Sequence, residues 1–179
     1  MSTRRTSQRL AERGEQREQR EQRDAEPAPA AKKQRTAPKA PAEPSKALAV
    51  GDALPELTLL DQHGKEVHLK DVKRAVIFTY PRANTPGCTR QAQCYRDDYA
   101  KWTDKDYQVF GLSTDAPSAQ LKWAEYTLLS DPKRELIGPL TGTTSSTRRS
   151  HFVITDGRLV QVSVGVKPVE SSENALTAT

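Results

Sequence analysis

Residues 80–89 read Tyr80-Pro81-Arg82-Ala83-Asn84-Thr85-Pro86-Gly87-Cys88-Thr89. Residues 75–80 form a continuous apolar run that Pro81 ends. A run of this kind is typical of a strand that is covered on both faces. Pro86 and Gly87 mark a turn, and residues 88–101 have helical composition. The stretch therefore predicts a buried strand, a tight loop and a helix that begins near Cys88.

Cys88 is expected in the first turn of that helix. A first turn has unpaired N–H groups and carries about half a positive charge. This field favours the thiolate, which is the nucleophilic form of cysteine. Thr85, three residues earlier, is placed to bring a hydroxyl beside the sulfur. A free cysteine is otherwise often a buried small hydrophobic residue, but the Pro-x3-Thr-x2-Cys spacing favours the reactive role.

Apolar runs and turn residues on either side of this stretch predict the rest of the fold. Gln62-His63-Gly64 and Asp156-Gly157 are the turns of two hairpins. The predicted elements are, in chain order, a hairpin over 57–69, the strand at 75–80, the helix at 88–101, a strand at 109–112, helices at 117–126 and 134–137, and a hairpin over 152–164. Tyr99 and Trp102 are expected to pack inward. This order predicts an α/β fold with a mixed central sheet and helices on both faces.

Residues 1–46 differ in composition from the rest of the chain. They contain 12 Lys and Arg against 7 Asp and Glu, so the whole formal charge of +5 lies in them. Apart from Met1 and Leu10, they have almost no apolar side chain larger than alanine, too few to offset the entropy of ordering. We predict a disordered basic tail at 1–46 and one folded domain at 47–179. The cluster Lys32-Lys33-Gln34-Arg35 is either a nuclear-import or nucleic-acid contact or part of a solubilising tail.

The cysteines and histidines give no metal-binding pattern. No apolar run approaches 18 residues and the charged N-terminus lacks the hydrophobic segment of a secretory signal, so we expect an intracellular protein without a membrane span. Two cysteines seldom form a permanent disulfide in that setting. Cys88 and Cys94 lie six residues apart, and His63, His68 and His151 are dispersed, so no zinc spacing exists. We expect neither a metal nor a cofactor.

The loop before Cys88 resembles the active-site loop of peroxiredoxins. The stretch Thr85-Pro86-Gly87-Cys88-Thr89 is similar in particular to the bacterioferritin-comigratory, or peroxiredoxin Q, branch. The similarity runs from about Val50 to the C-terminus through weaker blocks: Gln91-Ala92, Arg96-Asp97, Gly51-Asp52-x-Leu54-Pro55, Gly111-Leu112-Ser113-x-Asp115, Leu128-Leu129-Ser130-Asp131-Pro132 and Arg149-Ser150-His151-Phe152. The basic N-terminal extension and the Arg-Ser-His-Phe block resemble a fungal nuclear thiol peroxidase of this branch.

The resemblance implies a thioredoxin-like fold and a thiol-dependent peroxidase for hydrogen peroxide and alkyl hydroperoxides. Cys88 would form a sulfenic acid, with Thr85 and Arg149 completing its pocket and Pro81 shielding it. Arg149 suits this role because cleavage of the O–O bond places negative charge on the leaving oxygen. Without the resemblance, Arg149 would as readily be a surface ion-pair residue beside Arg148. The implied reductant is thioredoxin or a similar dithiol, and we expect a monomer.

Cys94 is the candidate resolving cysteine, although its position departs from the branch. The resolving cysteine of this branch usually lies five residues after the first, where this chain has Gln93. Six residues of intact helix separate two Cα atoms by roughly 10 Å, whereas a disulfide needs less than about 7 Å. The helix must therefore unwind locally before Cys88 and Cys94 can join. The alternative is an inert core cysteine.

Two further departures concern stability. The connection 123–128 is shorter than we expect, and residues 171–179 stand where the family fold usually closes with a full helix. We expect both to uncover core surface and make the domain marginal. His151 is a strand residue near the site, and its ordinary pKa near neutrality makes it a candidate for proton transfer.

Two other functions compete with the peroxidase. One is a redox-sensing nucleic-acid or chromatin-associated binding protein with little turnover, which would use the basic tail. The other is a thiol oxidoreductase acting on protein disulfides, which normally uses a Cys-x-x-Cys pair that this chain lacks. We expect the peroxidase to be nuclear, or otherwise cytoplasmic.

Overall fold

The computed structural model of the protein describes residues 47–121 and 123–179. Its elements are β1 (Thr58–Asp61), β2 (Glu66–His68), η1 (Leu69–Asp71), β3 (Ala75–Thr79), α2 (Pro86–Asp97), α3 (Tyr99–Thr103), β4 (Gln108–Ser113), α4 (Pro117–Gln120), β5 (Thr127–Ser130), α5 (Ile137–Thr141), β6 (Ser150–Thr155), β7 (Arg158–Val164), η2 (Pro168–Glu170) and α6 (Ser171–Leu176). The tail predicted at 1–46, with its basic cluster at 32–35, lies outside the described residues. In the described part, no helix is both long and apolar enough to cross a membrane.

One seven-stranded sheet organises the domain, with strand order β2-β1-β5-β4-β3-β6-β7. Strand β3 pairs in parallel with β4, and β4 pairs in parallel with β5. The other neighbours pair antiparallel. The mixed sheet and both hairpins are therefore confirmed. Because β3 has a neighbour on each side, the loop that leaves its C-terminal end is anchored at the centre of the sheet.

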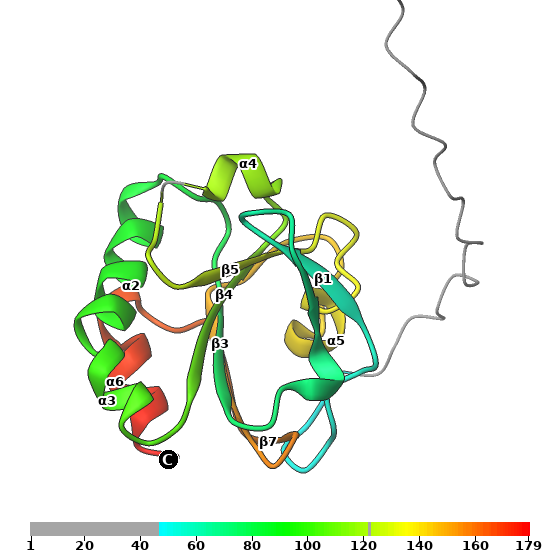
Figure 1. The fold of residues 1–179 in the computed structure, drawn as a ribbon, viewed down its shortest axis with the longest axis vertical. Helices are drawn as coiled ribbons and strands as arrows, with labels where there is room; N and C mark the ends of the chain where they lie inside the picture. The colour runs from blue at the N-terminus through cyan, green and yellow to red at the C-terminus, as the bar shows by residue number, and fades with distance from the viewer. Residues whose placement is uncertain (1–46, 122) are drawn as a thin grey trace, which may run out of the picture. The chain divides into compact units, whose positions relative to one another are not determined.

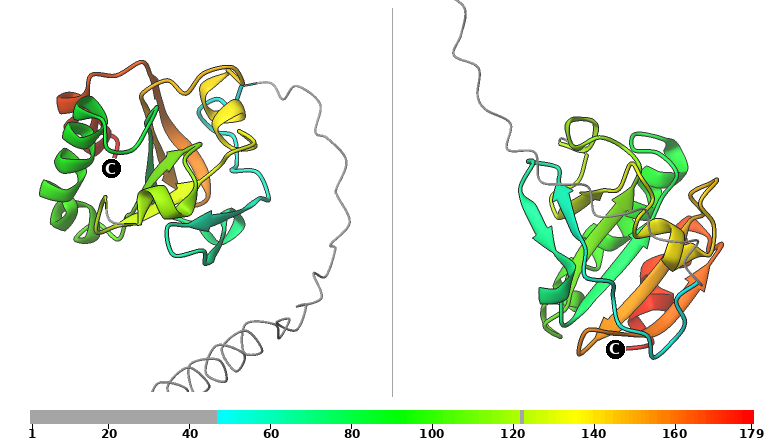
Figure 2. Two further views of the ribbon diagram at one scale, coloured as in Figure 1. Left: turned by 90° about the horizontal axis from the view of Figure 1, so that it is seen from above. Right: turned by 90° about the vertical axis from the view of Figure 1, so that its right-hand side faces the viewer.

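Helices cover both faces of the sheet, as Figures 1 and 2 show. Helices α2, α3 and α6 lie on one face, over an aromatic core that includes Phe78, Tyr95 and Trp102. Helix α5 lies on the other face, over an aliphatic core that includes Ile77. All five residues of β3 are buried, as its unbroken apolar run predicts. Alternate residues of β3 thus contribute to the two cores, because side chains alternate across a strand.

The helix predicted at 117–126 is wrong in its second half. Helix α4 ends at Gln120, and residues 127–130 form strand β5, which the sequence did not predict. Four residues are too few to show strand periodicity, and β5 is recognisable only through its parallel pairing with β4. Tyr99 is also 42% exposed, whereas Trp102 is fully buried as expected.

The helix predicted at 134–137 lies further along the chain, as α5. The Asp131 carboxylate accepts hydrogen bonds from the backbone N–H groups of Glu135, Leu136 and Ile137, each at 2.8 Å. These bonds satisfy backbone donors in the turn that leads into the helix. Arg134 has a left-handed φ of 59°, which a right-handed helix does not contain, so α5 starts after it, at Ile137.

Candidate active site

The loop between β3 and α2 is held by polar contacts from Asp115, which follows β4, and from Gln120 in α4. The Asp115 carboxylate accepts a hydrogen bond from the backbone N–H of Ala83 at 2.7 Å. The Tyr80 hydroxyl donates to the Gln120 side chain at 3.1 Å. Asn84 adopts a left-handed conformation with φ of 58°, which asparagine tolerates better than most residues. These contacts position the loop that leads into α2.

Cys88 is the third residue of α2 and is 2% exposed. No side chain caps the N-terminus of α2, and its first turn contains no acidic residue. The backbone N–H groups of Gly87 and Cys88 have no acceptor among the described residues. The Cys88 thiol therefore lies at the start of a helix, beside unpaired N–H donors, as the sequence predicts.

Arg149 supplies a positive charge at the Cys88 sulfur. Its Nη2 lies 3.5 Å and its Nη1 3.9 Å from Cys88 Sγ. A Cβ on Gly87 would lie 3.2 Å from Arg149 Nη2, so glycine leaves room for this approach. Within the described residues, no carboxylate forms a salt bridge with Arg149. The guanidinium is therefore available to an anion at the sulfur rather than neutralised by a partner.

The other two residues predicted around the sulfur are placed differently. The Thr85 hydroxyl donates to the backbone carbonyl of Arg82 at 3.0 Å, within its own loop, and makes no hydrogen bond to Cys88. Pro81 is exposed, and its shielding of the thiol stays a prediction. The structure thus brings Arg149 to Cys88, while the Thr85 hydroxyl bonds within the loop that leads into α2.

Cys94 lies on the same unbroken helix as Cys88, and both are free thiols. Its Sγ contacts the backbone carbonyl of Val169 in η2 at 3.9 Å. Burial raises the pKa of the Cys94 thiol, and the nearby carboxylates of Asp98 and Asp97 raise it further. Cys94 is therefore held in the thiol form, against the segment that leads into α6.

A buried polar cluster behind Arg149 has no counterpart in the sequence analysis. Gln91 Oε1 lies 3.5 Å from Arg149 Nη1, and Gln91 Nε2 donates to Ser171 Oγ at 3.2 Å. Ser171 Oγ also lies 3.0 Å from the Tyr95 hydroxyl and 3.3 Å from His151 Nδ1. In the sequence, Gln91 was only part of a block that resembles the peroxiredoxin Q branch, and no local pattern indicated a role for Ser171. Their meeting depends on α6 packing against α2.

His151 lies in this cluster and not at the sulfur. It is fully buried, and among the described residues no hydrogen bond joins it to Cys88. Burial lowers the pKa of His151 to about 4, so the ring is neutral at pH 7. A buried neutral imidazole with no hydrogen bond to the thiol is not placed to transfer a proton there.

We expect the neutral state of His151 to make the domain less stable in acid. The folded pKa of about 4 lies below the ordinary value of 6.5, so between these values the unfolded chain binds more protons. Stability should therefore fall as the pH drops through this window, by on the order of 3 kcal/mol for the full shift. The Tyr95 hydroxyl beside the ring stays neutral throughout, since burial raises its pKa.

Urea unfolding at pH 7 and pH 4.5 measures this effect, with His151→Gln as the comparison. The variant should lose less stability between the two pH values than the wild type does. Equal losses would show that His151 does not carry the acid sensitivity.

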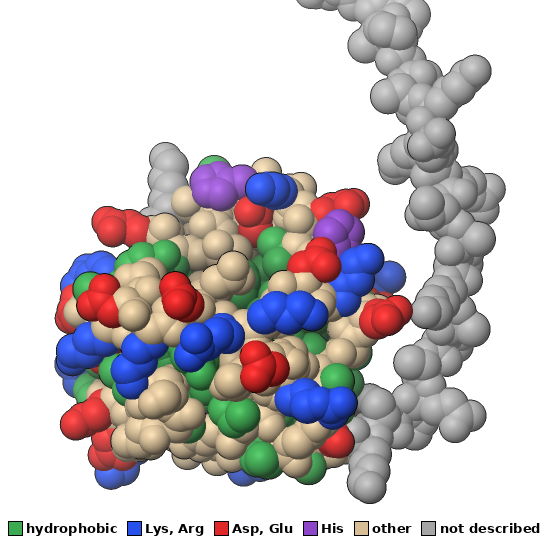
Figure 3. Space-filling model, turned by 60° about the horizontal axis from the view of Figure 1, so that its bottom comes forward, with side chains coloured by type: hydrophobic (Ala, Val, Ile, Leu, Met, Phe, Trp, Pro, Cys, Tyr) green, Lys and Arg blue, Asp and Glu red, His purple; other side chains and the backbone are tan. Residues whose placement is uncertain are grey.

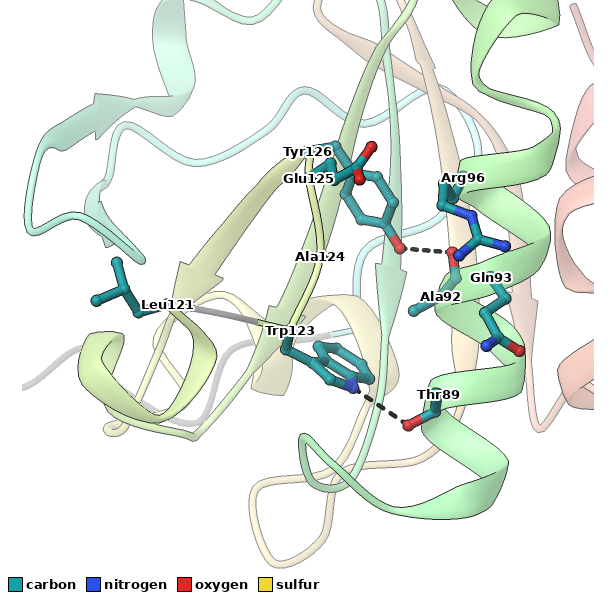
Figure 4. Close-up of a pocket in the computed structure, with 9 residues that line it drawn as sticks. All are labelled: Thr89, Ala92, Gln93, Arg96, Leu121, Trp123, Ala124, Glu125 and Tyr126. Carbon is teal, nitrogen blue, oxygen red and sulfur yellow. Dashed lines mark hydrogen bonds between the residues drawn. The ribbon is translucent and has the colours of Figure 1, made fainter.

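A surface pocket of about 370 Å³ flanks α2 on the side that faces the 121–126 connection. Figure 4 shows its lining, which includes Arg96, Trp123 and Tyr126. The Trp123 indole donates to the Thr89 hydroxyl at 3.2 Å, and the Tyr126 hydroxyl donates to the Ala92 carbonyl at 2.8 Å. The short connection thus covers the aromatic core by bonding to α2.

In the described residues, no group of three or more His, Cys, Asp or Glu is placed to share a metal ion.

Comparison with known proteins places this site in a family. Residues 50–163 match the AhpC/TSA family. Peroxiredoxin bcp1 of Schizosaccharomyces pombe is 38% identical over 141 residues, which cover 72% of each chain. The solved structure of Peroxidoxin BcpB from Mycobacterium tuberculosis has a TM-score of 0.65 at 28% identity and covers 73% of this chain and 96% of that chain. PrxQ of Xylella fastidiosa, at 20% identity, shares the fold with a TM-score of 0.67 over 74% of this chain and 96% of that chain.

Fold and relatives together define a thiol peroxidase of the thioredoxin-like class, which is an oxidoreductase. The chain belongs to the AhpC/TSA family, and the relatives it resembles carry the names of the Bcp and Q peroxiredoxins. The fold and family expected from the loop around Cys88 are confirmed.

Proposed function

We propose that the chain reduces hydrogen peroxide and small alkyl hydroperoxides at Cys88. The observation that carries this proposal is the approach of Arg149 Nη2 to within 3.5 Å of Cys88 Sγ at the uncapped start of α2. A guanidinium and unpaired N–H groups both stabilise a thiolate. Cys88 is 2% exposed, and such burial favours small peroxides over bulky ones.

The first step is attack of the Cys88 thiolate on a peroxide oxygen. The sulfur supplies the electron pair of a new S–O bond, the O–O bond breaks, and its electron pair leaves on the second oxygen. That oxygen takes a proton and departs as water or an alcohol, while Cys88 remains as a sulfenic acid. Arg149 Nη groups and the free N–H groups of Gly87 and Cys88 are placed to stabilise the charge that develops.

In the second step, Cys94 attacks the sulfenic acid, and water leaves as the disulfide forms. The continuous helix holds the two cysteines apart, so α2 must unwind between them. Unwinding also removes Cys94 from the Val169 carbonyl. Two thiols of thioredoxin or a similar dithiol then reduce the disulfide and become oxidised themselves.

We expect the Cys94→Ser variant to perform one turnover and stop. Reduced wild type treated with one equivalent of hydrogen peroxide should contain one intramolecular disulfide and should turn over repeatedly with thioredoxin, thioredoxin reductase and NADPH. The variant should consume one equivalent, retain a sulfenic acid on Cys88 that dimedone traps, and stall with thioredoxin. Mass spectrometry of the trapped species and the oxidation of NADPH measure both results.

Gln93→Ser is the matched control, because Gln93 is exposed and occupies the usual position of the resolving cysteine. It should keep the disulfide and the turnover of the wild type. A stable sulfenic acid in the unmutated protein would show that Cys94 takes no part in the cycle.

The alternative of a nucleic-acid-binding protein depends on residues 1–46 and stays a prediction from the sequence. The face drawn in Figure 3 carries basic and acidic side chains side by side. This pattern agrees with the balanced charge of residues 47–179. That face therefore does not present the uniformly positive charge that attracts a polyanion.

A further inference from the structure

Ser171 is the centre of the buried polar cluster that ends at the catalytic arginine. It is fully buried, is the first residue of α6, and lies 80 residues after Gln91 in the chain. Three side chains from two other elements reach its hydroxyl: Gln91 and Tyr95 from α2, and His151 from β6. Helix α6 is therefore tied to the active site through one hydroxyl group.

The donors and acceptors of this cluster fix the orientation of the Gln91 amide. Gln91 Nε2 donates to Ser171 Oγ, so the carbonyl end, Oε1, faces Arg149. Tyr95 donates its hydroxyl proton to the backbone carbonyl of Ser171 at 3.2 Å. The Ser171 hydroxyl keeps one proton for Tyr95 or for His151. Without the Ser171 acceptor, a buried amide N–H would lack a partner, and the amide would rotate away to find one.

We propose that Ser171 is a positioning residue for Arg149 and acts through Gln91. This inference rests on the proposed function of Arg149 at the Cys88 thiolate. Gln91 Oε1 is the only side-chain oxygen that accepts from the guanidinium among the described residues. Arg149 has many rotamers and no carboxylate to hold it, so the Gln91 amide is the group that keeps Nη2 at the sulfur.

Ser172 offers a matched control in the same helix. It is fully buried like Ser171, and its hydroxyl accepts a hydrogen bond from the Trp102 indole at 3.3 Å. No hydrogen bond connects it to Gln91 or Arg149. Ser171→Ala and Ser172→Ala therefore each remove one buried hydroxyl from α6, and only the first touches the chain of contacts that leads to the guanidinium.

The test is the second-order rate of Cys88 oxidation by hydrogen peroxide, followed by stopped-flow fluorescence in full-length protein that also carries Cys94→Ser. We expect Ser171→Ala to lower this rate about fivefold, since one hydrogen bond is lost. Gln91→Met, which keeps the side-chain length and removes the amide, should lower it similarly. Ser172→Ala should stay within about twofold of the parent.

A double-mutant cycle separates positioning from loss of stability. If Ser171 acts through Arg149, adding Ser171→Ala to Arg149→Gln should change the rate by less than about twofold, because the target of the positioning is already gone. The proposal would be overturned if Ser171→Ala and Ser172→Ala slowed Cys88 oxidation equally. It would also be overturned if Ser171→Ala slowed the reaction of the Arg149→Gln variant as much as it slows that of the parent. Should the parent itself not react with peroxide, the proposed function would fail first and this inference with it.

Discussion

Replacing Cys88 with serine is expected to lower the rate of peroxide consumption by at least about 1000-fold, as loss of a catalytic nucleophile does in other enzymes. A serine hydroxyl stays protonated near neutral pH, and Arg149 cannot ionise it as it assists a thiol. Serine and cysteine differ in one side-chain atom, so the substitution nearly preserves the shape of this buried side chain. The expected loss is therefore chemical and not a consequence of misfolding.

Stopped-flow consumption of hydrogen peroxide by reduced wild type and Cys88→Ser measures this effect. Cys94→Ser is the control, because it removes the other thiol and should leave the first turnover intact. Equal rates for wild type and Cys88→Ser would refute a peroxidase centred on this residue.

The second large effect is expected at Arg149. Arg149→Gln removes the positive charge at the sulfur and keeps a polar side chain, and it should slow Cys88 oxidation about 100-fold, as loss of a group that stabilises transition-state charge does. Arg149→Lys should recover only part of this loss, because an ammonium cannot present two N–H donors in the plane of a guanidinium.

Arg148→Gln is the matched control for the charge of the protein. Arg148 is the exposed neighbour of Arg149, and its side chain takes no part in the site. The variant should react with peroxide at the wild-type rate. A similar slowing in both glutamine variants would mean that net charge steers the peroxide and that the contact of Arg149 with the sulfur is unimportant.

The proposed site gathers three segments that are far apart in the chain. The loop after β3 leads directly into the start of α2, which carries Cys88. The residue before β6 is Arg149, and α6 adds Ser171. Helix α6 and η2 also lie against the face of α2 that bears Gln91 and Cys94. Unwinding of α2 between Cys88 and Cys94 would break the Gln91 bond to Ser171, so the contact proposed to order Arg149 for the first step would oppose the second.

The sequence predicted what depends on short, local patterns. An apolar run ended by proline indicated β3, and the spacing around Cys88 indicated a thiol at a helix start. The sequence also pointed to Arg149, but through the family resemblance and not through a physical argument from the residues. Local patterns failed at residues 121–130, because a four-residue strand shows no periodicity of its own and exists through its pairing with β4.

By itself, then, the sequence predicted the candidate nucleophile, the helix at whose start it lies and the class of fold, since backbone propensity and helix polarity act within a few residues. Tertiary structure alone decided which groups meet that nucleophile. It brought Arg149 over Gly87 and placed Ser171 behind Gln91. The physical reason is that these contacts join atoms separated by dozens of residues, so they are set by how α2, α6 and β6 pack on one sheet and leave no trace in the local sequence.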